Sequence, residues 1–455
     1  MRTNRFLALC AFVLLALSAS AQSPEAIRES LAKYPKLTNP THSTYPSIPL
    51  GEVAAAPEGF EPFYFTLVGR HGSRYEQSIK RFRKAVTTFA KADSLGILTP
   101  DGKLLYQRMK AIYNEQKGHD GELTQLGVEQ WRGISSRAYE RFRTIFENGT
   151  IEAKSSISLR CVFSMVAFNE KMKELCPQIN IQQSARKCDQ GIVRPLVDDP
   201  TVSEQARKLH KDYMDNGEWE KVRKKWQHEC DAPEFVAKVT TDRDTFLKEC
   251  GAKNNFRIAR YSFITLNFGD NFELGDIELL KRLYTVDELY SMYVYNVATW
   301  TNGSVGRGND YAEMRQSHMR AMIDDIISKA EEAIKGKNPA SANLRFTHDS
   351  YVGPLLSAIG YDGCVPQYSS DIETTSTSFN HGTNLPMAAN LQIVLYRNKQ
   401  GEVFVRSLIN ERDATLPIKC ATAPFYPWKE FCKHVRNNMS YLSKAEARVL
   451  SRHNE

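Results

Sequence analysis

The sequence has 455 residues, of which 42% are hydrophobic and 25% are charged, and no tract of it is of low complexity. A chain of this length and composition can bury a large core, which excludes disorder on a large scale. The formal net charge of +7 suits a small anionic substrate, but it also suits generic surface binding, so charge alone does not decide the function.

The first residues have the pattern of an export signal. Arg2 and Arg5 precede an apolar run over residues 6–17, and residues 19–21 (Ala-Ser-Ala) offer a small-x-small cleavage site. The run is too short for a membrane-spanning helix, and no later segment reaches the necessary length. We therefore expect a signal peptide over residues 1–21, a periplasmic or secreted protein, and no membrane span in the mature chain.

Eight cysteines remain after this cleavage, and an even number permits disulfides in an oxidising compartment, although the spacing gives no connectivity. No C-x-x-C pair is present, so a structural zinc site is not expected. The eight are Cys161, Cys176, Cys188, Cys230, Cys250, Cys364, Cys420 and Cys432.

The first part of the mature chain is expected to form one strand followed by helices. Residues 22–60 are rich in Pro and Ser and are expected to be an irregular lead-in. The run Phe-Tyr-Phe-Thr-Leu-Val over residues 63–68 favours a buried strand. Helices are expected over residues 78–92 and 123–146, the second with Thr124 as its N-cap.

The middle of the chain has mainly helical patterns. A short strand near residues 156–159 is expected to lead into a helix that reaches Met172. Residues 179–301 are charged, aromatic and helical in pattern, as expected of an inserted cap domain. Helical spacing of apolar residues returns between Met319 and Ala330.

The last part alternates again. A strand over residues 344–347 precedes a helix over 352–359, and two further strands are expected over 391–396 and 403–408. Strands and helices at both ends with helices between them indicate an α/β core with an α-helical insertion.

The segment Arg70-His71-Gly72-Ser73-Arg74 follows the first predicted strand, where α/β sheets form ligand sites. Gly72 would let the backbone approach a ligand closely, and a following helix start favours an anion. Arg70 and Arg74 can bind phosphate oxygens in bidentate fashion. A neutral imidazole at His71 could then attack phosphorus, while the cationic surroundings would depress its pKa and keep it unprotonated. The segment predicts a phosphate site with a histidine nucleophile.

The dipeptide His348-Asp349 also follows a predicted strand. His348 can donate a hydrogen bond to a phosphate oxygen, and Asp349 can supply the proton that an alkoxide leaving group requires. Alone this pair is weak evidence, because long proteins contain several such pairs.

Together the two motifs resemble the histidine acid phosphatase family. Residues 123–130 resemble its L-T-x-x-G-x-x-Q helix, and residues 155–162 resemble the segment that carries a third phosphate-binding arginine. Residues 386–391 resemble a late element of the family. The similarity covers most of the mature chain in the family's order and is poorest across residues 179–301.

The resemblance implies an α/β fold with a mixed central sheet flanked by helices, like that of phosphoglycerate mutase, and an inserted α-helical cap. The expected division is a core over residues 22–178 and 302–455 with the cap over 179–301. No cofactor or metal is implied, because the arginines supply the positive charge. Neither a nucleic-acid partner nor an oligomeric state is implied.

Carried over by residue, the family implies His71 as the nucleophile that forms a phosphohistidine and Asp349 as the proton donor. The phosphate ligands implied by the same resemblance are Arg70, Arg74, Arg160 and His348. For Asp349 the alternative is a helix N-cap, and for Arg160 it is a structural ion pair.

Arg74-Tyr75 and Arg160-Cys161 look most like the inositol-polyphosphate phosphatase branch. Two features depart from that pattern: Glu76 stands where the family usually has proline, and the branch generally has His-Ala-Glu where this chain has a His-Asp pair. Inositol polyphosphates are the favoured substrates. The alternatives are a broad acid phosphatase acting on sugar phosphates and other small esters, and a non-catalytic phosphate-binding protein.

Basic residues in the helix after the motif contact outlying substrate phosphates in related phytases. A solvated helix face is the alternative for this chain. The residues concerned are Lys80, Arg81, Arg83 and Lys84.

Overall fold

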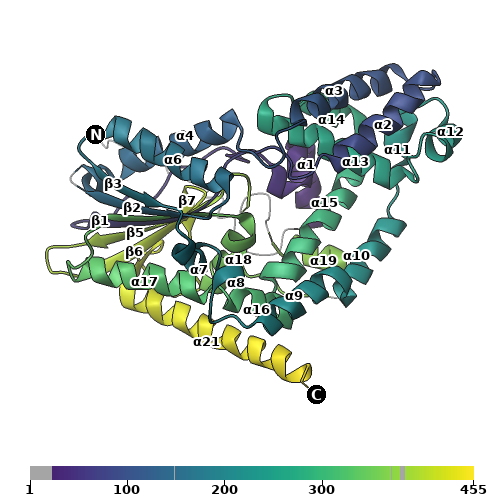
Figure 1. Cartoon of the computed structure of the whole chain (residues 1–455). Coiled ribbons are helices and arrows are strands. Elements are labelled where there is room, and N and C mark those ends of the chain that lie inside the picture. The colour runs from purple at the N-terminus through teal and green to yellow at the C-terminus, as the bar shows by residue number, and fades with distance from the viewer. Residues whose placement is uncertain (1–22, 148, 370, 380–384, 455) are drawn as a thin grey trace, which may run out of the picture.

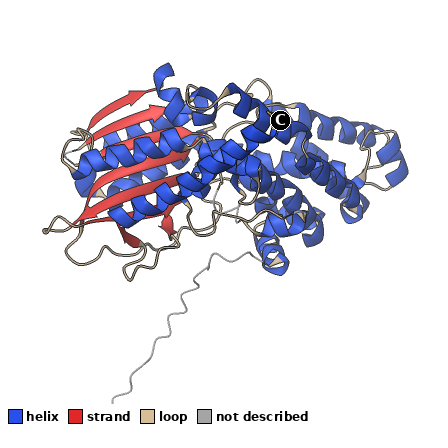
Figure 2. Ribbon diagram, turned by 90° about the horizontal axis from the view of Figure 1, so that it is seen from below, coloured by secondary structure: helices blue, strands red, loops and turns tan. Residues whose placement is uncertain are grey.

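The computed structural model describes residues 23–147, 149–369, 371–379 and 385–454, so the predicted signal peptide lies outside the described residues. A sheet with helices on both faces forms one end of the molecule, and a group of helices without strands forms the other (Figures 1 and 2). Within the described ranges, no helix is both long and apolar enough to cross a membrane.

The described strands form a single mixed sheet. Its order is β3-β2-β4-β1-β5-β6-β7, with β8 paired to β6. The half of the sheet formed by β3, β2, β4 and β1 is parallel throughout. From β1 to β5 and onward to β6, β7 and β8, every pair is antiparallel. The strands are β1 (Glu61–Arg70), β2 (Thr150–Ser155), β3 (Asn180–Ser184), β4 (Ala342–Thr347), β5 (Asn390–Arg397), β6 (Val403–Ile409), β7 (Arg412–Ala414) and β8 (Phe425–Pro427).

Helices cover both faces of the sheet, which is why β1 and β4 consist of nearly continuous buried residues. Figure 1 shows α4 and α6 on one side of the sheet and α17 and α21 on the other. The helices of this end are α4 (Gln125–Arg141), α5 (Arg143–Phe146), α6 (Leu159–Leu175), α7 (Gln190–Val193), α8 (Pro195–Asp198), α9 (Glu204–Asn216), α16 (Asp310–Ser317), α17 (Arg320–Ile334), α18 (Asp349–Ile359) and α21 (Trp428–Arg452).

The other end has a hydrophobic core of its own, formed between helices that are far apart in the sequence. These helices are α1 (Pro24–Lys33), α2 (Lys80–Ser94), α3 (Pro100–Gln116), α10 (Glu218–Glu229), α11 (Pro233–Val239), α12 (Arg243–Lys248), α13 (Asn255–Gly269), α14 (Ile277–Leu283), α15 (Val286–Trp300) and α19 (Ile372–Thr377). Short 3₁₀ turns η1 (Pro35–Thr38), η2 (Pro40–His42), η3 (Lys187–Asp189) and η4 (Asp270–Phe272), and a π-helix η5 (Thr301–Val305), complete the described helices.

The predicted fold class, a mixed sheet flanked by helices with a helical second part, is confirmed. The helical part is larger than residues 179–301, because α1, α2 and α3 share its core. At the other boundary, β3 pairs with β2 and therefore belongs to the sheet. Sequence order alone does not show that α2 and α3 pack against helices far along the chain, so the predicted core over residues 22–178 includes them.

Two local predictions were wrong. The lead-in over residues 22–60 contains α1, which Ser23 caps by accepting a hydrogen bond from the Ala26 backbone N–H, with Pro24 in the first turn. The strand expected near residues 156–159 lies earlier, as β2, where buried and half-buried residues alternate. The serines after it belong to a loop that enters α6.

Close backbone contact between α4 and the loop after β1 predicts a destabilising substitution. A Cβ at Gly127 would lie 2.2 Å from the Ser73 carbonyl oxygen, so Gly127→Ala should destabilise the fold by about 1–3 kcal/mol. In the matched control Gly133→Ala, on the same helix, the new methyl would meet only the end of the Arg137 side chain, and stability should change by less than about 1 kcal/mol. Urea unfolding measures both, and equal stabilities would contradict the contact.

Candidate active site

Parallel pairing gathers the carboxyl ends of three strands at one edge of the sheet. The last residue of β1, Arg70, is in register with the last residue of β4, Thr347, and Ser155 at the end of β2 pairs one position earlier on β4. His71 and His348 therefore leave neighbouring strands side by side. This is the edge at which open α/β sheets form ligand sites.

The His71 ring is held in a defined protonation state. Its Nδ1 lies 2.9 Å from the Gly72 carbonyl oxygen. Because a carbonyl oxygen can only accept, Nδ1 carries the hydrogen and Nε2 keeps its lone pair. Burial, and then the positive charges of Arg70 and Arg74 and the neighbouring His348, hold the pKa of His71 well below its ordinary value. The imidazole is therefore neutral even in acid.

Arg70 is completely buried beside this ring. Its Nη1 donates to the carbonyl oxygens of Thr41 and Leu385, at 2.7 and 3.0 Å, and its Nη2 lies 2.8 Å from Oδ2 of Asp349. Burial lowers the pKa of Arg70 to about 10, against the opposing effect of Asp349, so the guanidinium stays charged at neutral pH. Arg74 is 6% exposed and adds a second buried positive charge.

Two helices of the sheet end hold the loop that carries these residues. The Ser73 backbone N–H donates to Oε1 of Gln130 at 2.8 Å, and Nε2 of Gln130 donates back to the Ser73 hydroxyl at 2.9 Å. The Gly72 backbone N–H donates to the Ser164 hydroxyl on α6 at 3.0 Å. The glutamine of the L-T-x-x-G-x-x-Q segment thus serves to position the motif loop.

The structure brings His348 and Arg160 to the same place. The two rings of His71 and His348 lie 5.6 Å apart, centroid to centroid, and Nη2 of Arg160 lies 3.4 Å from Nδ1 of His348. The hydroxyls of Ser156 and Ser158 lie 3.2 and 3.4 Å from the other ring nitrogen, Nε2. Burial, followed by the charge of Arg160, lowers the pKa of His348 to about 3. Arg160 also lowers the pKa of His71, as expected if its charge faces both rings.

Asp349 is the first residue of α18, whose N-cap is His348, so the N-cap alternative does not hold. One carboxylate oxygen pairs with Arg70, the other accepts from the Ser350 backbone N–H at 2.8 Å, and the side chain is 21% exposed. Burial raises the pKa of Asp349, but Arg70, Arg74 and His348 outweigh it and hold this pKa below its ordinary value. In the free protein Asp349 is therefore ionised at neutral pH.

Glu76, at the position where the family usually has proline, is buried in the same loop. Its carboxylate lies 3.7 Å from Arg74 and 3.9 Å from Arg81, and it accepts from the Gln77 backbone N–H. The Glu76 backbone N–H donates to the Gln116 side chain at 2.8 Å, a bond that proline could not make. The acid therefore partly neutralises the motif's second arginine.

The basic residues after the motif are exposed on α2. Arg81 faces the site loop through Glu76, and Lys84 lies 5.9 Å from the centre of the Tyr261 ring on α13. Lys80 and Arg83 are exposed on the same helix, and the structure gives them no contact with the motif residues. Of the predicted outer residues, Arg81 is thus the one with a direct link to the site.

Two further arginines near the site were missed by the sequence analysis. The charge of Arg194 lowers the pKa of His348, and its buried Nε has no hydrogen-bond partner among the described residues. Arg260, on α13, donates to Asn296 at 3.1 Å, and its charge lowers the pKa of His42 after burial and the two motif arginines. Two arginines, Arg257 and Arg260, interrupt the apolar residues of α13 and were a weak signal, whereas no sequence pattern marks Arg194.

The arrangement combines a neutral ring nitrogen with a lone pair, a surround of buried guanidinium groups and a carboxyl group. Such a set attracts a phosphate group and offers it a nucleophile and a proton carrier. No group of three or more His, Cys, Asp or Glu side chains in the described parts of the chain is arranged to hold a metal ion.

Comparison with solved structures gives the same fold. The multiple inositol polyphosphate phosphatase of Bifidobacterium longum, in complex with inositol hexasulfate, matches with a TM-score of 0.63 and 16% identity, over 88% of this chain and 97% of that chain. The phytase from D. castellii matches with a TM-score of 0.65 and 15% identity, over 89% of this chain and 85% of that chain. A comparison with curated proteins found no match.

The model of the histidine phosphatase superfamily (branch 2) matches residues 65–410, which is most of the chain and includes every residue of the site described above except those of the N-terminal lead-in. The chain therefore belongs to branch 2 of the histidine phosphatase superfamily, and its activity is that of a phosphatase.

Proposed function

We propose that the protein is an exported phosphomonoesterase that removes phosphate groups from inositol polyphosphates through a phosphohistidine intermediate. The observation that carries this proposal is the neutral His71 ring, with Nδ1 held by the Gly72 carbonyl oxygen and with buried arginines around it. Export rests on the signal pattern of residues 1–21 and implies a periplasmic or secreted location.

In the first step the lone pair of His71 Nε2 attacks phosphorus. The new N–P bond forms as the ester P–O bond breaks, and the leaving oxygen takes a proton from Asp349. Arg70, Arg74 and Arg160 stabilise the charge on the phosphoryl oxygens during the transfer.

Asp349 must be protonated for this step although it is ionised in the free protein. A phosphate dianion bound to Arg70 and Arg74 offsets the two charges that depress the Asp349 pKa. Substrate binding therefore raises this pKa and favours the acid form at the moment when the acid is needed. Acidic conditions favour it further, while His71 stays neutral.

In the second step a water molecule attacks the phosphohistidine. The Asp349 carboxylate accepts the proton of this water, the N–P bond breaks, and inorganic phosphate leaves. The enzyme thereby returns to a neutral His71 and a protonated Asp349, which then equilibrates with solvent.

Positive charge beyond the reacting phosphate supports inositol polyphosphates as substrates. Arg81 and Arg260 both lower the pKa of His42, whose pKa is also lowered by Arg70 and Arg74, so these charges share one region. A ring that carries several phosphates could engage these outer arginines while one phosphate reaches His71. The solved relatives named for inositol polyphosphate and phytate hydrolysis point in the same direction.

A specific observation favours the second candidate, a broad acid phosphatase. Ile157, Leu159 and Phe163 flank Arg160 in the sequence and are 55%, 70% and 54% exposed. Apolar side chains at this place suit an apolar or aromatic leaving group better than a highly charged ring.

A product-resolved assay tests the proposal. The protein should hydrolyse inositol hexakisphosphate with a higher kcat/KM than p-nitrophenyl phosphate, and His71→Ala should lower kcat by on the order of 10⁴-fold or more while phosphate still binds. Quenching of the wild-type reaction in alkali, which preserves the acid-labile N–P bond, should trap phosphate on His71. A preference for the aryl ester would support the second candidate, and turnover by His71→Ala would remove the nucleophile assignment.

The loss of kcat caused by Asp349→Asn should increase with the basicity of the leaving group. Without the acid, kcat should fall by about 10²–10⁴-fold for alkyl phosphates, whose leaving alkoxides need the proton, and by much less for p-nitrophenyl phosphate. Steady-state kinetics on a series of esters measures this slope. An equal loss for all leaving groups would mean that Asp349 is not the proton donor for the ester oxygen.

Glu76→Gln should tighten phosphate binding. Removing the buried carboxylate leaves Arg74 and Arg81 less neutralised, so the inhibition constant of inorganic phosphate should fall by about three- to tenfold, which corresponds to ~1 kcal/mol. Glu115→Gln, which removes an exposed acid bonded to Tyr75 nearby, should change this constant by less than about twofold. Equal effects of the two substitutions would contradict a specific role of Glu76.

A further inference from the structure

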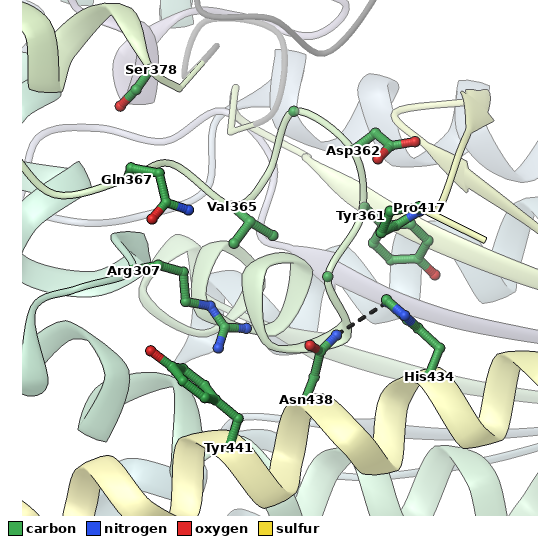
Figure 3. A pocket seen from close by; sticks show the side chains of 12 residues that line it. Arg307, Tyr361, Asp362, Val365, Gln367, Ser378, Pro417, His434, Asn438 and Tyr441 are labelled. Carbon is green, nitrogen blue, oxygen red and sulfur yellow. Dashed lines mark hydrogen bonds between the residues drawn. The ribbon is translucent and has the colours of Figure 1, made fainter. Parts of the chain in front are cut away.

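A polar cavity of about 490 Å³ lies at the opposite end of α18 from Asp349. Its walls come from the loop that follows this helix at Gly360, from α21, and from Arg307 just after the π-helix η5 (Figure 3). The 11 residues of α18 place the cavity roughly 15 Å from the active-site end of the helix. The cavity is therefore a separate site.

Arg307 is held firmly in the wall of this cavity. Its backbone N–H donates to Pro366 at 2.7 Å, and its carbonyl oxygen accepts from the Tyr368 N–H at 2.6 Å. Its Nη2 donates to the Ser357 carbonyl oxygen on α18 at 3.1 Å, and the guanidinium lies 5.2 Å from the centre of the Tyr441 ring. The side chain is thus positioned before any ligand arrives.

The guanidinium keeps hydrogen-bonding capacity that the described residues do not use. Arg307 is 8% exposed, and its buried Nε has no partner among the described residues. Leaving a buried donor unsatisfied costs about 1–3 kcal/mol. Burial also lowers the pKa of Arg307, which shows that its charge is poorly solvated. A ligand oxygen beside the terminal guanidinium nitrogens would offset the poor solvation of this charge.

Among the described residues, two acidic groups lie near the cavity, and only one of them is paired with another cation. Glu313, which favours the charged form of Arg307, already accepts from Arg448 at 3.0 Å and from the Tyr441 hydroxyl at 2.7 Å. Asp362 lies across the cavity from Arg307 and accepts from the Thr415 hydroxyl at 2.6 Å (Figure 3). Asp362 keeps its negative charge, so the cavity has a cation on one wall and a carboxylate on the opposite one, and an anion would bind on the Arg307 side.

The wall formed by α21 is neutral and packs against the C-terminal end of α18. Asn438 donates to the Ile359 carbonyl oxygen at 3.0 Å and lies 3.1 Å from Nε2 of His434. Burial lowers the pKa of His434, which keeps this ring neutral. Gly360, at φ +89°, leaves room for both side chains, since a Cβ there would lie 2.3 Å from the Asn438 amide nitrogen.

We propose that this cavity is a binding site for a small oxyanion, a carboxylate or a phosphate, held by the Arg307 guanidinium. The planar guanidinium fork matches both oxyanions in bidentate fashion, and its rigid placement reduces the entropy lost on binding. The cavity volume admits a ligand larger than inorganic phosphate, so polar groups of a small organic acid could contact Gln367 and Asn438. The proposal does not depend on the reaction at His71.

Equilibrium dialysis of the mature protein tests this site with inorganic phosphate and, separately, with citrate. Wild-type protein should bind phosphate at two sites, and Arg307→Gln should retain one of them. Citrate binding that disappears in Arg307→Gln identifies a carboxylate site, whereas loss of the second phosphate alone identifies a phosphate site. A single phosphate site and no Arg307-dependent citrate binding would overturn the proposal.

Because Arg307 also bonds Ser357, its replacement could impair folding, and an exposed position provides an independent test. Gln367 lines the cavity mouth and is exposed, so both charged replacements are tolerable there. Gln367→Lys should tighten oxyanion binding at this site and Gln367→Glu should weaken it, each by about three- to tenfold. Turnover of p-nitrophenyl phosphate within about twofold of wild type verifies the fold, and equal affinities of the two variants would overturn the proposal.

Discussion

The parallel pairing of β1 with β4 is the constraint on which the site depends. Its register sets Arg70 opposite Thr347, so the next residue of each strand, His71 and His348, leaves the sheet at the same edge. These residues are 277 positions apart in the sequence, yet no long loop is needed to bring their side chains together. A shift of the register by one residue would turn the two side chains to opposite faces and separate them.

The charge distribution at this edge follows from burial. Guanidinium groups in a poorly solvated site destabilise the folded protein when no phosphate is bound. Nearby carboxylates offset part of this cost by pairing with the guanidinium groups. Arg70 is paired with Asp349, and Arg74 is close to Glu76. An entering phosphate competes with both carboxylates for the same arginines. Binding and the protonation of Asp349 are therefore coupled through shared partners.

The positions of the motif residues at strand ends, though not their roles, could be predicted from the sequence. The apolar run predicts the strand, and the Arg-His-Gly-x-Arg motif follows it directly. The positions of His71 and Arg74 could therefore be predicted without information about distant contacts. The same holds for His348 and Asp349 after β4. The prediction of Thr124 as the N-cap of α4 is confirmed, because a cap is a local interaction.

What the sequence left out depends on packing between distant segments. The helical end is formed by α1, α2 and α3 together with α10 to α15 and α19. Apolar periodicity shows that a helix has a buried face, but it does not show which partner covers that face. Arg194 precedes a proline at the start of a four-residue helix, where no pattern marks a functional side chain. Its place beside His348 follows only from the course of the chain after β3.

The side-chain amide of Gln116 makes two hydrogen bonds to the backbone of Glu76: it accepts from the N–H and donates to the carbonyl oxygen. Only the second of these bonds is open to a proline. Proline at position 76 would leave the Gln116 amide oxygen without its donor, so the backbone N–H of residue 76 and the amide at position 116 form a matched pair in this chain.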